Sequence, residues 1–175
     1  MNLDRVTPGK NVPNEFNVII EISMNSDPIK YEIDEKSGAI FVDRFMLTAL
    51  RYPCNYGYIP KTLSEDNDPI DVLVYSPFPI QMGSVITCRA IGMLDMEDES
   101  GKDIKILAIP VTRLYPAYSY IKTYIDLPIE EIKRIEHFFK HYKDIEIKKW
   151  VKILGWKDVN SANEKILTGI EKFFD

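Results

Sequence analysis

Three aspartates within six residues are the strongest chemical signal in the sequence. Asp66, Asp68 and Asp71 lie in the run 66–71 (DNDPID), directly before an apolar segment. Carboxylates this close repel one another unless a cation or a basic group lies between them. A divalent ion such as Mg²⁺, which prefers oxygen ligands, would relieve that repulsion. Read alone, the run fits a solvated acidic turn equally well, because aspartate, asparagine and proline are common turn residues.

Two rival interpretations of this run fail. An EF-hand loop beginning at Asp66 would need glycine at its sixth position and glutamate at its twelfth. Asp71 and Pro77 stand there instead. An enzyme that forms an aspartyl phosphate would need an apolar strand leading into its first aspartate, whereas residues 62–65 are TLSE.

A second acidic set lies farther along the chain. Asp98 and Asp103 flank Gly101, and Lys105 follows two residues later. In an extended strand Asp103 and Lys105 project from the same face. Taken by itself, the segment 95–103 is typical of a solvated hairpin loop.

Cations and tyrosines suited to binding phosphate are scattered through the same chain. Arginine can form paired hydrogen bonds with phosphate, lysine supplies a point charge, and tyrosine donates without adding net charge. Each of these residues alone has an ordinary structural interpretation. Together with the carboxylates, however, they fit phosphoryl transfer, which depends on positioning and charge neutralisation. This set, with one glutamate beside its first lysine, is Lys30, Glu32, Arg44, Tyr52, Tyr56, Tyr142 and Lys143.

Other chemistries have little support. His137 and His141 are four residues apart and face the same way on a helix. Phe138 follows the first of them, which rules out a zinc-protease motif, and we interpret the pair as packing or interface residues. The sequence has no P-loop, no dinucleotide-binding glycine motif and no nucleophile elbow. The reaction should therefore use an activated water, without a covalent enzyme intermediate.

The elements that must position these residues are strands first and helices last. Helices are predicted from Pro128 to Tyr142 and from near Ser161, where Ser161 and Glu164 form a capping box. Residues 95–102 are expected to be a connection. The order predicts one α+β, mainly β domain over residues 1–175, a small antiparallel barrel with helices packed outside. Strands are expected at residues 16–23, 30–34, 39–44, 71–75, 85–93 and 104–111.

Charge, cysteines and hydropathy limit the possible partners and cellular location. The net charge of −5 over 175 residues offers no general basic surface for nucleic acid. Cys54 and Cys88 are far apart and are expected to be reduced and buried. The N-terminal ten residues lack the apolar region of a signal peptide, and no apolar stretch could span a bilayer. We therefore expect a cytoplasmic protein with no membrane partner.

Several motifs together resemble one known family. The run 66–72 (DNDPIDV) is similar to the signature of the soluble family I inorganic pyrophosphatases, and further segments resemble its bacterial members in the same order. The resemblance covers nearly the whole chain and is weakest at residues 93–102, at residues 115–126 and in the C-terminal helix. The other matching segments are 29–32 (IKYE), 41–45 (FVDRF), 52–58 (YPCNYGY) and 137–143 (HFFKHYK).

The resemblance implies a fold, a reaction and a role for each site residue. The fold would be a five-stranded OB-like β-barrel with two C-terminal α-helices packed outside. The reaction would be hydrolysis of inorganic pyrophosphate to two phosphates by a Mg²⁺-activated water. Asp68 would orient or deprotonate the water; the metal ligands would be Asp66, Asp71 and Asp103, with Asp98 and Glu21 serving further ions. The phosphate-binding residues would be Lys30, Arg44, Tyr56, Lys105, Tyr142 and Lys143, with Glu32 and Tyr52 as supporting residues.

The resemblance also implies assembly and one small departure. Bacterial members commonly form hexamers, and His137 and His141 match positions near a subunit interface. Asn67 stands where the family often has glycine. Both residues tolerate turn conformations, so we expect little effect.

Two functions of other classes compete with the enzyme. OB-like barrels often bind single-stranded nucleic acid or oligosaccharide, but the net charge of −5 and the carboxylate-rich face argue against a nucleic-acid groove. An assembly protein that merely retains the fold would have no need of the intact set of carboxylates, cations and tyrosines.

Overall fold

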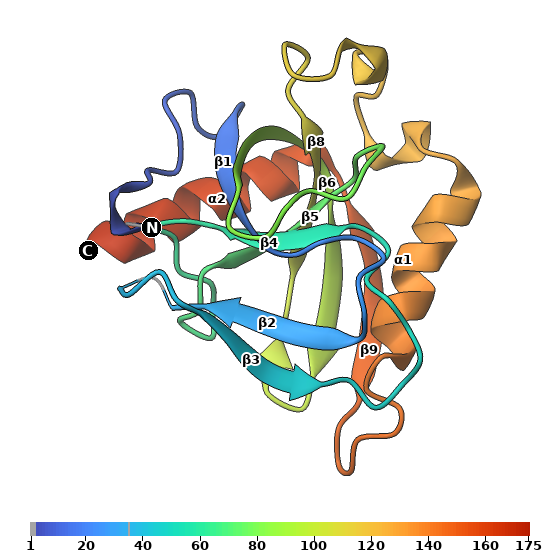
Figure 1. Cartoon of the computed structure of the whole chain (residues 1–175). Coiled ribbons are helices and arrows are strands. Elements are labelled where there is room, and N and C mark those ends of the chain that lie inside the picture. The colour runs from blue at the N-terminus through green and yellow to red at the C-terminus, as the bar shows by residue number, and fades with distance from the viewer. Residues whose placement is uncertain (1–2, 35) are drawn as a thin grey trace.

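A closed ring of five strands forms the centre of the molecule (Figure 1). The computed structural model describes residues 3–34 and 36–175. The ring closes because β1 pairs with β4 on one side and with β6 on the other. Neighbouring pairs are antiparallel except β5 and β8, which are parallel. In spatial order the ring strands are β1 (Phe16–Ile22), β4 (Asn55–Ile59), β5 (Ile70–Val74), β8 (Lys105–Pro110) and β6 (Val85–Asp98).

Two short additions extend the sheet beyond the ring. β7 (Gly101–Lys102) and β9 (Val151–Lys157) both pair with the far half of β6. The connection expected at residues 95–102 is therefore wrong, because β6 runs on to Asp98 and turns back into β7. Asp95, Glu97 and Asp98 therefore belong to a paired strand, which fixes where their side chains point.

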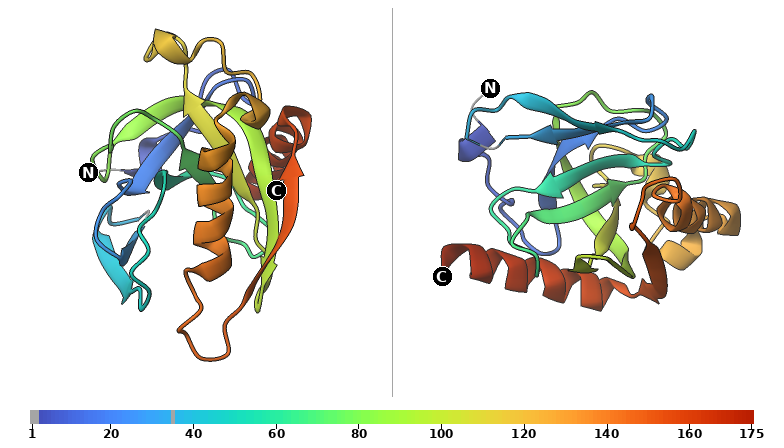
Figure 2. Two further views of the ribbon diagram at one scale, coloured as in Figure 1. Left: turned by 90° about the vertical axis from the view of Figure 1, so that its right-hand side faces the viewer. Right: turned by 90° about the horizontal axis from the view of Figure 1, so that it is seen from below.

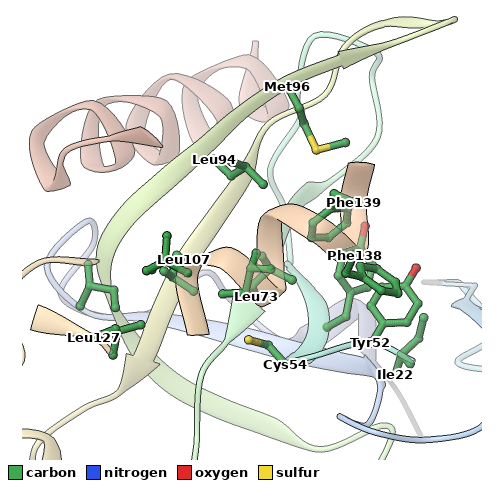
Figure 3. Close-up of a cluster of buried hydrophobic side chains, with 14 of the residues drawn as sticks. Ile22, Tyr52, Cys54, Leu73, Leu94, Met96, Leu107, Leu127, Phe138 and Phe139 are labelled. Atoms are coloured by element: carbon green, nitrogen blue, oxygen red, sulfur yellow. The ribbon is translucent and has the colours of Figure 1, made fainter. Parts of the chain in front are cut away.

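Beyond Asp71 and Lys105, the strands β5 and β8 are buried on both faces, which explains the apolar runs 72–74 and 106–110. Leu73 and Leu107 lie in a cluster that also holds Phe138 and Phe139 (Figure 3). The alternate residues of these strands lie in a second cluster, which includes Ile166. Gly57 of β4 is required by the tight ring: a Cβ there would lie 2.0 Å from the carbonyl oxygen of Ile19 on β1.

A separate two-stranded sheet lies beside the ring. β2 (Ile29–Ile33) pairs with β3 (Ile40–Phe45), as the sequence predicts, and Lys30 lies opposite Arg44. Residue 35, in the predicted turn of this hairpin, lies outside the described residues. Most of β3 is exposed, so the hairpin has far less packing than the ring.

Two helices cover different sides of the sheet (Figure 2). α1 (Ile129–His141) packs against β9 and the first cluster, and Pro128 is its N-cap. Its buried residues are Ile132, Ile135, Phe138 and Phe139. α2 (Val159–Phe174) packs against β6. Three short 3₁₀ turns complete the structure: η1 (Leu3–Arg5), η2 (Pro116–Tyr118) and η3 (Tyr124–Asp126).

The predicted fold class is confirmed, with local corrections. β4 and β9 were absent from the predicted strands. The expected cap of the last helix is also wrong: Asp158 caps α2, and its carboxylate accepts a hydrogen bond from the Ser161 N–H at 2.9 Å. Cys54 and Cys88 are buried free thiols, as expected.

Candidate active site

Lys105 is the centre of a buried charged cluster at one end of the ring. Its ammonium donates to Asp71 at 2.5 Å, to Asp103 at 2.7 Å and to the Tyr56 hydroxyl at 3.2 Å. The parallel pairing of β5 with β8 brings Asp71 and Lys105 together, and Asp103 lies two residues before Lys105, between β7 and β8. Burial opposes the lysine charge, but the negative charges of Asp71 and Asp103 hold the pKa of Lys105 well above its usual range. Lys105 is therefore a fixed cation although it is only 4% exposed.

The acidic loop (residues 62–70) joins β4 to β5 and is held by its own hydrogen bonds. At its base the Thr62 hydroxyl donates to the carbonyl of Ile59 at 2.6 Å and accepts from the Ile70 N–H at 3.0 Å. At its tip the Asp66 carboxylate accepts from the Asp68 N–H at 3.0 Å. Asn67 adopts a φ of 67°, a left-handed conformation that asparagine tolerates.

The aspartates of this loop influence one another electrostatically. Burial raises the pKa of Asp68, and the neighbouring charges of Asp66 and Asp71 raise it further. The three residues of the sequence signal therefore face a common region.

Glu21 links the ring to the hairpin. It lies on β1, and its carboxylate accepts a hydrogen bond from the Ile33 N–H of β2 at 2.9 Å. Burial raises its pKa from an ordinary value of 4.5 to about 8, and the charges of Asp71 and Glu32 act in the same direction. Glu21 therefore faces the same carboxylates as the acidic loop.

The hairpin presents two more cations. Lys30 pairs with Glu32 at 2.6 Å, as their shared strand face predicts, and with Asp43 at 3.3 Å. The guanidinium of Arg44 lies 3.8 Å from Asp43 and 3.4 Å from Glu146. The Arg44 Nε is buried and has no hydrogen-bond partner among residues 3–34 and 36–175, which leaves a donor free for an anion.

The end of α1 supplies a third group. Lys143 pairs with Asp98 at 2.6 Å and Glu99 at 3.5 Å, and its ammonium lies 5.5 Å from the centre of the Tyr142 ring. Burial opposes ionisation of Asp98, but hydrogen bonds from Lys143 and the Ser100 N–H lower its pKa overall. The two acidic sets of the sequence thus reach cations from different elements.

Charged residues of the ring, of the hairpin and of the segment after α1 all act on Tyr142. Its pKa is raised chiefly by burial, and the charges that act on it come from Lys105, Lys143, Asp103 and Arg44. Lys105 belongs to the ring, Lys143 follows α1, and Arg44 belongs to the hairpin. Burial likewise raises the pKa of Asp103, and Asp71 and Asp98 raise it further.

Aromatic packing supports this site from behind. The Tyr52 ring lies 5.0 Å from that of Tyr56 and 4.6 Å from that of Phe138, between centroids. Figure 3 shows Tyr52 beside Phe138 and Ile22 in the buried cluster. The structure thus brings together the expected site residues. His137 and His141 instead contact each other with tilted rings, 4.6 Å between centroids, and the His141 ring lies 2.7 Å from Asp144.

Three acidic residues that hold these cations were missed by sequence reasoning. Asp43, Glu99 and Glu146 contact Lys30, Lys143 and Arg44 respectively. Asp43 is adjacent to Arg44 in the matched segment, which is a signal that could have been used. Glu146 is separated from Arg44 by 102 positions, and no local pattern points to it.

The donor set suits a hard divalent cation. Its members are carboxylate oxygens whose mutual repulsion a cation would relieve. Within the described ranges no three histidine, cysteine or acidic side chains are already arranged around a metal position. The Lys105 ammonium takes an oxygen of both Asp71 and Asp103.

Comparison with known proteins decides the family. The family model described as inorganic pyrophosphatase matches residues 18–173. The chain belongs to the inorganic pyrophosphatase family. The family's activity, hydrolysis of pyrophosphate, agrees with the charged site described above.

Individual relatives agree over nearly the full length. The inorganic pyrophosphatase of Yersinia pestis is 53% identical over 98% of both chains. A crystal structure of an inorganic phosphatase from Anaplasma phagocytophilum has a TM-score of 0.95 at 48% identity and covers 97% of this chain and 99% of its own. The inorganic pyrophosphatase of Thermus thermophilus has a TM-score of 0.93 at 37% identity, with both chains fully covered. In the part of the chain that the structure describes, no helix is long and apolar enough to cross a membrane.

Proposed function

We propose that this enzyme hydrolyses inorganic pyrophosphate with a Mg²⁺-activated water and without a covalent enzyme intermediate. The observation that carries the proposal is the buried contact of the Lys105 ammonium with Asp71, Asp103 and Tyr56, which sets a fixed cation among carboxylates. Pyrophosphate carries several negative charges at neutral pH and would repel a hydroxide. A site that neutralises this charge and orients water meets the needs of the reaction.

The carboxylates divide between metal binding and proton transfer. Asp66, Asp71 and Asp103 would hold Mg²⁺, with Asp98 and Glu21 serving further ions. Bound Mg²⁺ would neutralise charge on the substrate and lower the pKa of its water.

Asp68 orients the attacking water and accepts its proton. Its raised pKa favours proton acceptance closer to neutral pH than an ordinary aspartate allows. The hydrogen bond between its N–H and Asp66 fixes its backbone beside the metal ligands.

The cations and tyrosines bind the phosphate groups. The buried tyrosines keep their protons, because burial raises the pKa of both Tyr56 and Tyr142, so their hydroxyls can donate to phosphate oxygens. Glu32 and Tyr52 orient Lys30 and Tyr56 through the contacts described above. The phosphate-binding set is Lys30, Arg44, Tyr56, Lys105, Tyr142 and Lys143.

Phosphate release from pyrophosphate tests this proposal. We expect rapid release with Mg²⁺ and little with EDTA or in the Asp68→Asn variant. The exposed Asp4→Asn variant is the matched control and should keep full activity. Equal release in all these cases, or none with Mg²⁺, would contradict the proposal.

We also propose that six copies assemble with His137 and His141 near an interface. The support is the resemblance to hexameric bacterial members. In addition, the two histidines contact each other on α1 outside its set of buried residues. Sedimentation of the parent and of a variant with both histidines changed to alanine tests this. A monomeric parent would reject the assembly, and an unchanged hexamer in the variant would remove the role of the histidines.

Residues 1–175 are proposed to form a single domain located in the cytoplasm. The family match over residues 18–173 and the two buried free thiols support these points. Limited proteolysis that yields two stable fragments, or fractionation that finds the protein outside the cytoplasm, would contradict them.

A further inference from the structure

The last helix contacts the acidic loop at three consecutive residues. The Leu63 N–H donates to the carbonyl of Gly169 at 2.9 Å. The Lys172 ammonium donates to the carbonyl of Ser64 at 2.6 Å. The Lys165 ammonium pairs with the carboxylate of Glu65 at 3.0 Å. Both backbone and side chains of the loop are therefore tied to α2.

Gly169 allows α2 to approach the loop this closely. A Cβ at this position would lie 2.3 Å from the Cδ1 of Ile70 and 3.2 Å from the carbonyl oxygen of Leu63. Both neighbours belong to the acidic loop, and Ile70 is fully buried and directly precedes Asp71. Alanine is favoured over glycine inside a helix, so helix formation does not explain this residue, whereas close packing does.

A short chain of hydrogen bonds connects Lys172 to Asp68. Lys172 holds the carbonyl of Ser64, and the N–H of the same Ser64 donates to the carbonyl of Asp68 at 2.7 Å. The Ser64 carbonyl also accepts from the Asn67 N–H at 3.3 Å. Ser64 thus fixes the tip of the loop from inside, and α2 fixes Ser64 from outside.

The two lysines of α2 act on different parts of the loop. Lys172 binds a backbone carbonyl, which is part of the loop's own hydrogen-bond network. Lys165 binds the side chain of Glu65, which is more than half exposed. Both contacts lie at the surface, so exposure does not rank them. The larger effect is expected from Lys172 because the carbonyl that it binds also accepts the Asn67 N–H inside the loop.

We propose that α2 positions the acidic loop, with Gly169 and Lys172 as positioning residues for Asp66 and Asp68. The effect on activity rests on the proposed function of this loop. The anchoring itself is a property of the fold and can be measured without substrate or metal.

Two pairs of variants test the proposal. Lys172→Met removes the donor and keeps the aliphatic stem, and Lys165→Met is its matched control. Gly169→Ala introduces the Cβ, and Thr168→Ala is its control, because Thr168 is exposed and bonds only to carbonyls of its own helix among the described residues. Hydrogen exchange of the amides in residues 62–70 reports the order of the loop, and kcat, KM and the Mg²⁺ concentration for half activation report its alignment.

We expect faster exchange in residues 62–70 for Lys172→Met and Gly169→Ala than for either control. Loss of one charged hydrogen bond should lower kcat about fivefold in Lys172→Met, with a smaller change in KM and a higher Mg²⁺ requirement. Lys172→Arg retains both the charge and a donor and should restore most of the kcat, whereas Lys165→Met removes a charge from the same helix and should leave kcat nearly unchanged. Thermal unfolding checks that the variants remain folded.

The outcomes separate this proposal from the proposed function. Unchanged exchange, or faster exchange with unchanged kcat, in Lys172→Met would overturn the positioning role. If Asp68→Asn is inactive in that case, the proposed function stands. An active Asp68→Asn would overturn the role of Asp68, and the exchange measurement would still decide whether α2 holds the loop.

Discussion

The two sides of the charged site are built differently. On the ring side, Lys105 is buried between Asp71 and Asp103, on strands that are paired along both edges. On the hairpin side, Lys30 and Arg44 lie on a two-stranded sheet, and about a quarter of each side chain is exposed. Their carboxylate partners, apart from Glu32, lie at 3.3–3.8 Å, longer than the contacts of Lys105.

We therefore expect the ring side to be rigid and the hairpin side to be adaptable. A two-stranded hairpin alone is marginally stable, whereas central strands of a closed sheet open only with the whole fold. Figure 1 shows the hairpin beside the ring and outside its closed path. The ring side, where Asp71 lies beside Lys105, is therefore preorganised, and the two hairpin cations expected to bind phosphate, Lys30 and Arg44, can adjust to the substrate.

The largest effect is expected on the ring side. Lys105→Met leaves Asp71 and Asp103 buried without their cation, and removing one partner of a buried ion pair costs about 3–5 kcal/mol. Both the free energy of unfolding and kcat/KM should fall strongly, as measured by urea denaturation and phosphate release. Lys30→Met is the hairpin counterpart and should change the unfolding free energy by less than about 1 kcal/mol. Equal destabilisation in the two variants would contradict the comparison.

An intermediate effect is expected on the hairpin side. Arg44→Ala removes a charged donor and should raise KM for pyrophosphate about tenfold or more. Glu146→Gln leaves Arg44 without its ion pair and should raise KM by a smaller factor, because the guanidinium is less well fixed. If Glu146 acts through Arg44, Glu146→Gln should have no further effect in the Arg44→Ala background.

Lys149 provides the control for that cycle. Its ammonium lies 3.0 Å from the same oxygen of Glu146 that contacts Arg44. Lys149→Met should leave the coupling between Arg44 and Glu146 in place. Additive effects of Arg44→Ala and Glu146→Gln on KM would show that Glu146 does not position Arg44.

The smallest effect is a pH-dependent change in stability at Glu21, which links the ring to the hairpin. The folded-state pKa of Glu21 is about 8 against an ordinary 4.5, so between these values the folded state keeps a proton that the unfolded chain has released. Raising the pH through this window therefore lowers the stability of the parent. Glu21→Gln cannot ionise and retains an acceptor for the Ile33 N–H.

The stability of Glu21→Gln relative to the parent should thus rise from pH 5 to pH 8. Urea unfolding in EDTA at several pH values measures this difference. A constant difference across the range would mean that Glu21 titrates normally in the folded protein.

Sequence reasoning reached the contacts that depend on strand period. Alternation alone placed Lys30 beside Glu32 and Asp103 beside Lys105, and both pairs are in contact. It missed β4, which is buried on both faces and shows no alternation. It also missed β9, whose pattern is obscured by the partly exposed Leu154.

The remaining contacts have no local signal. Glu146 reaches Arg44, and Lys172 reaches Ser64, only because the fold brings distant segments together. The same reason explains the end of β6, where an acidic segment typical of a loop is a strand because β9 pairs with it. Periodicity describes one helix or strand at a time, whereas each of these contacts depends on two separate segments.

The contact between α2 and the acidic loop has a consequence for protein synthesis. The ribosome releases the chain from its N-terminus, and Ser64 precedes its anchor Lys172 by 108 positions. Every side chain proposed for the reaction is present once Lys143 has been made. The nascent chain therefore holds all the proposed chemical groups before it holds the helix that is proposed to align them.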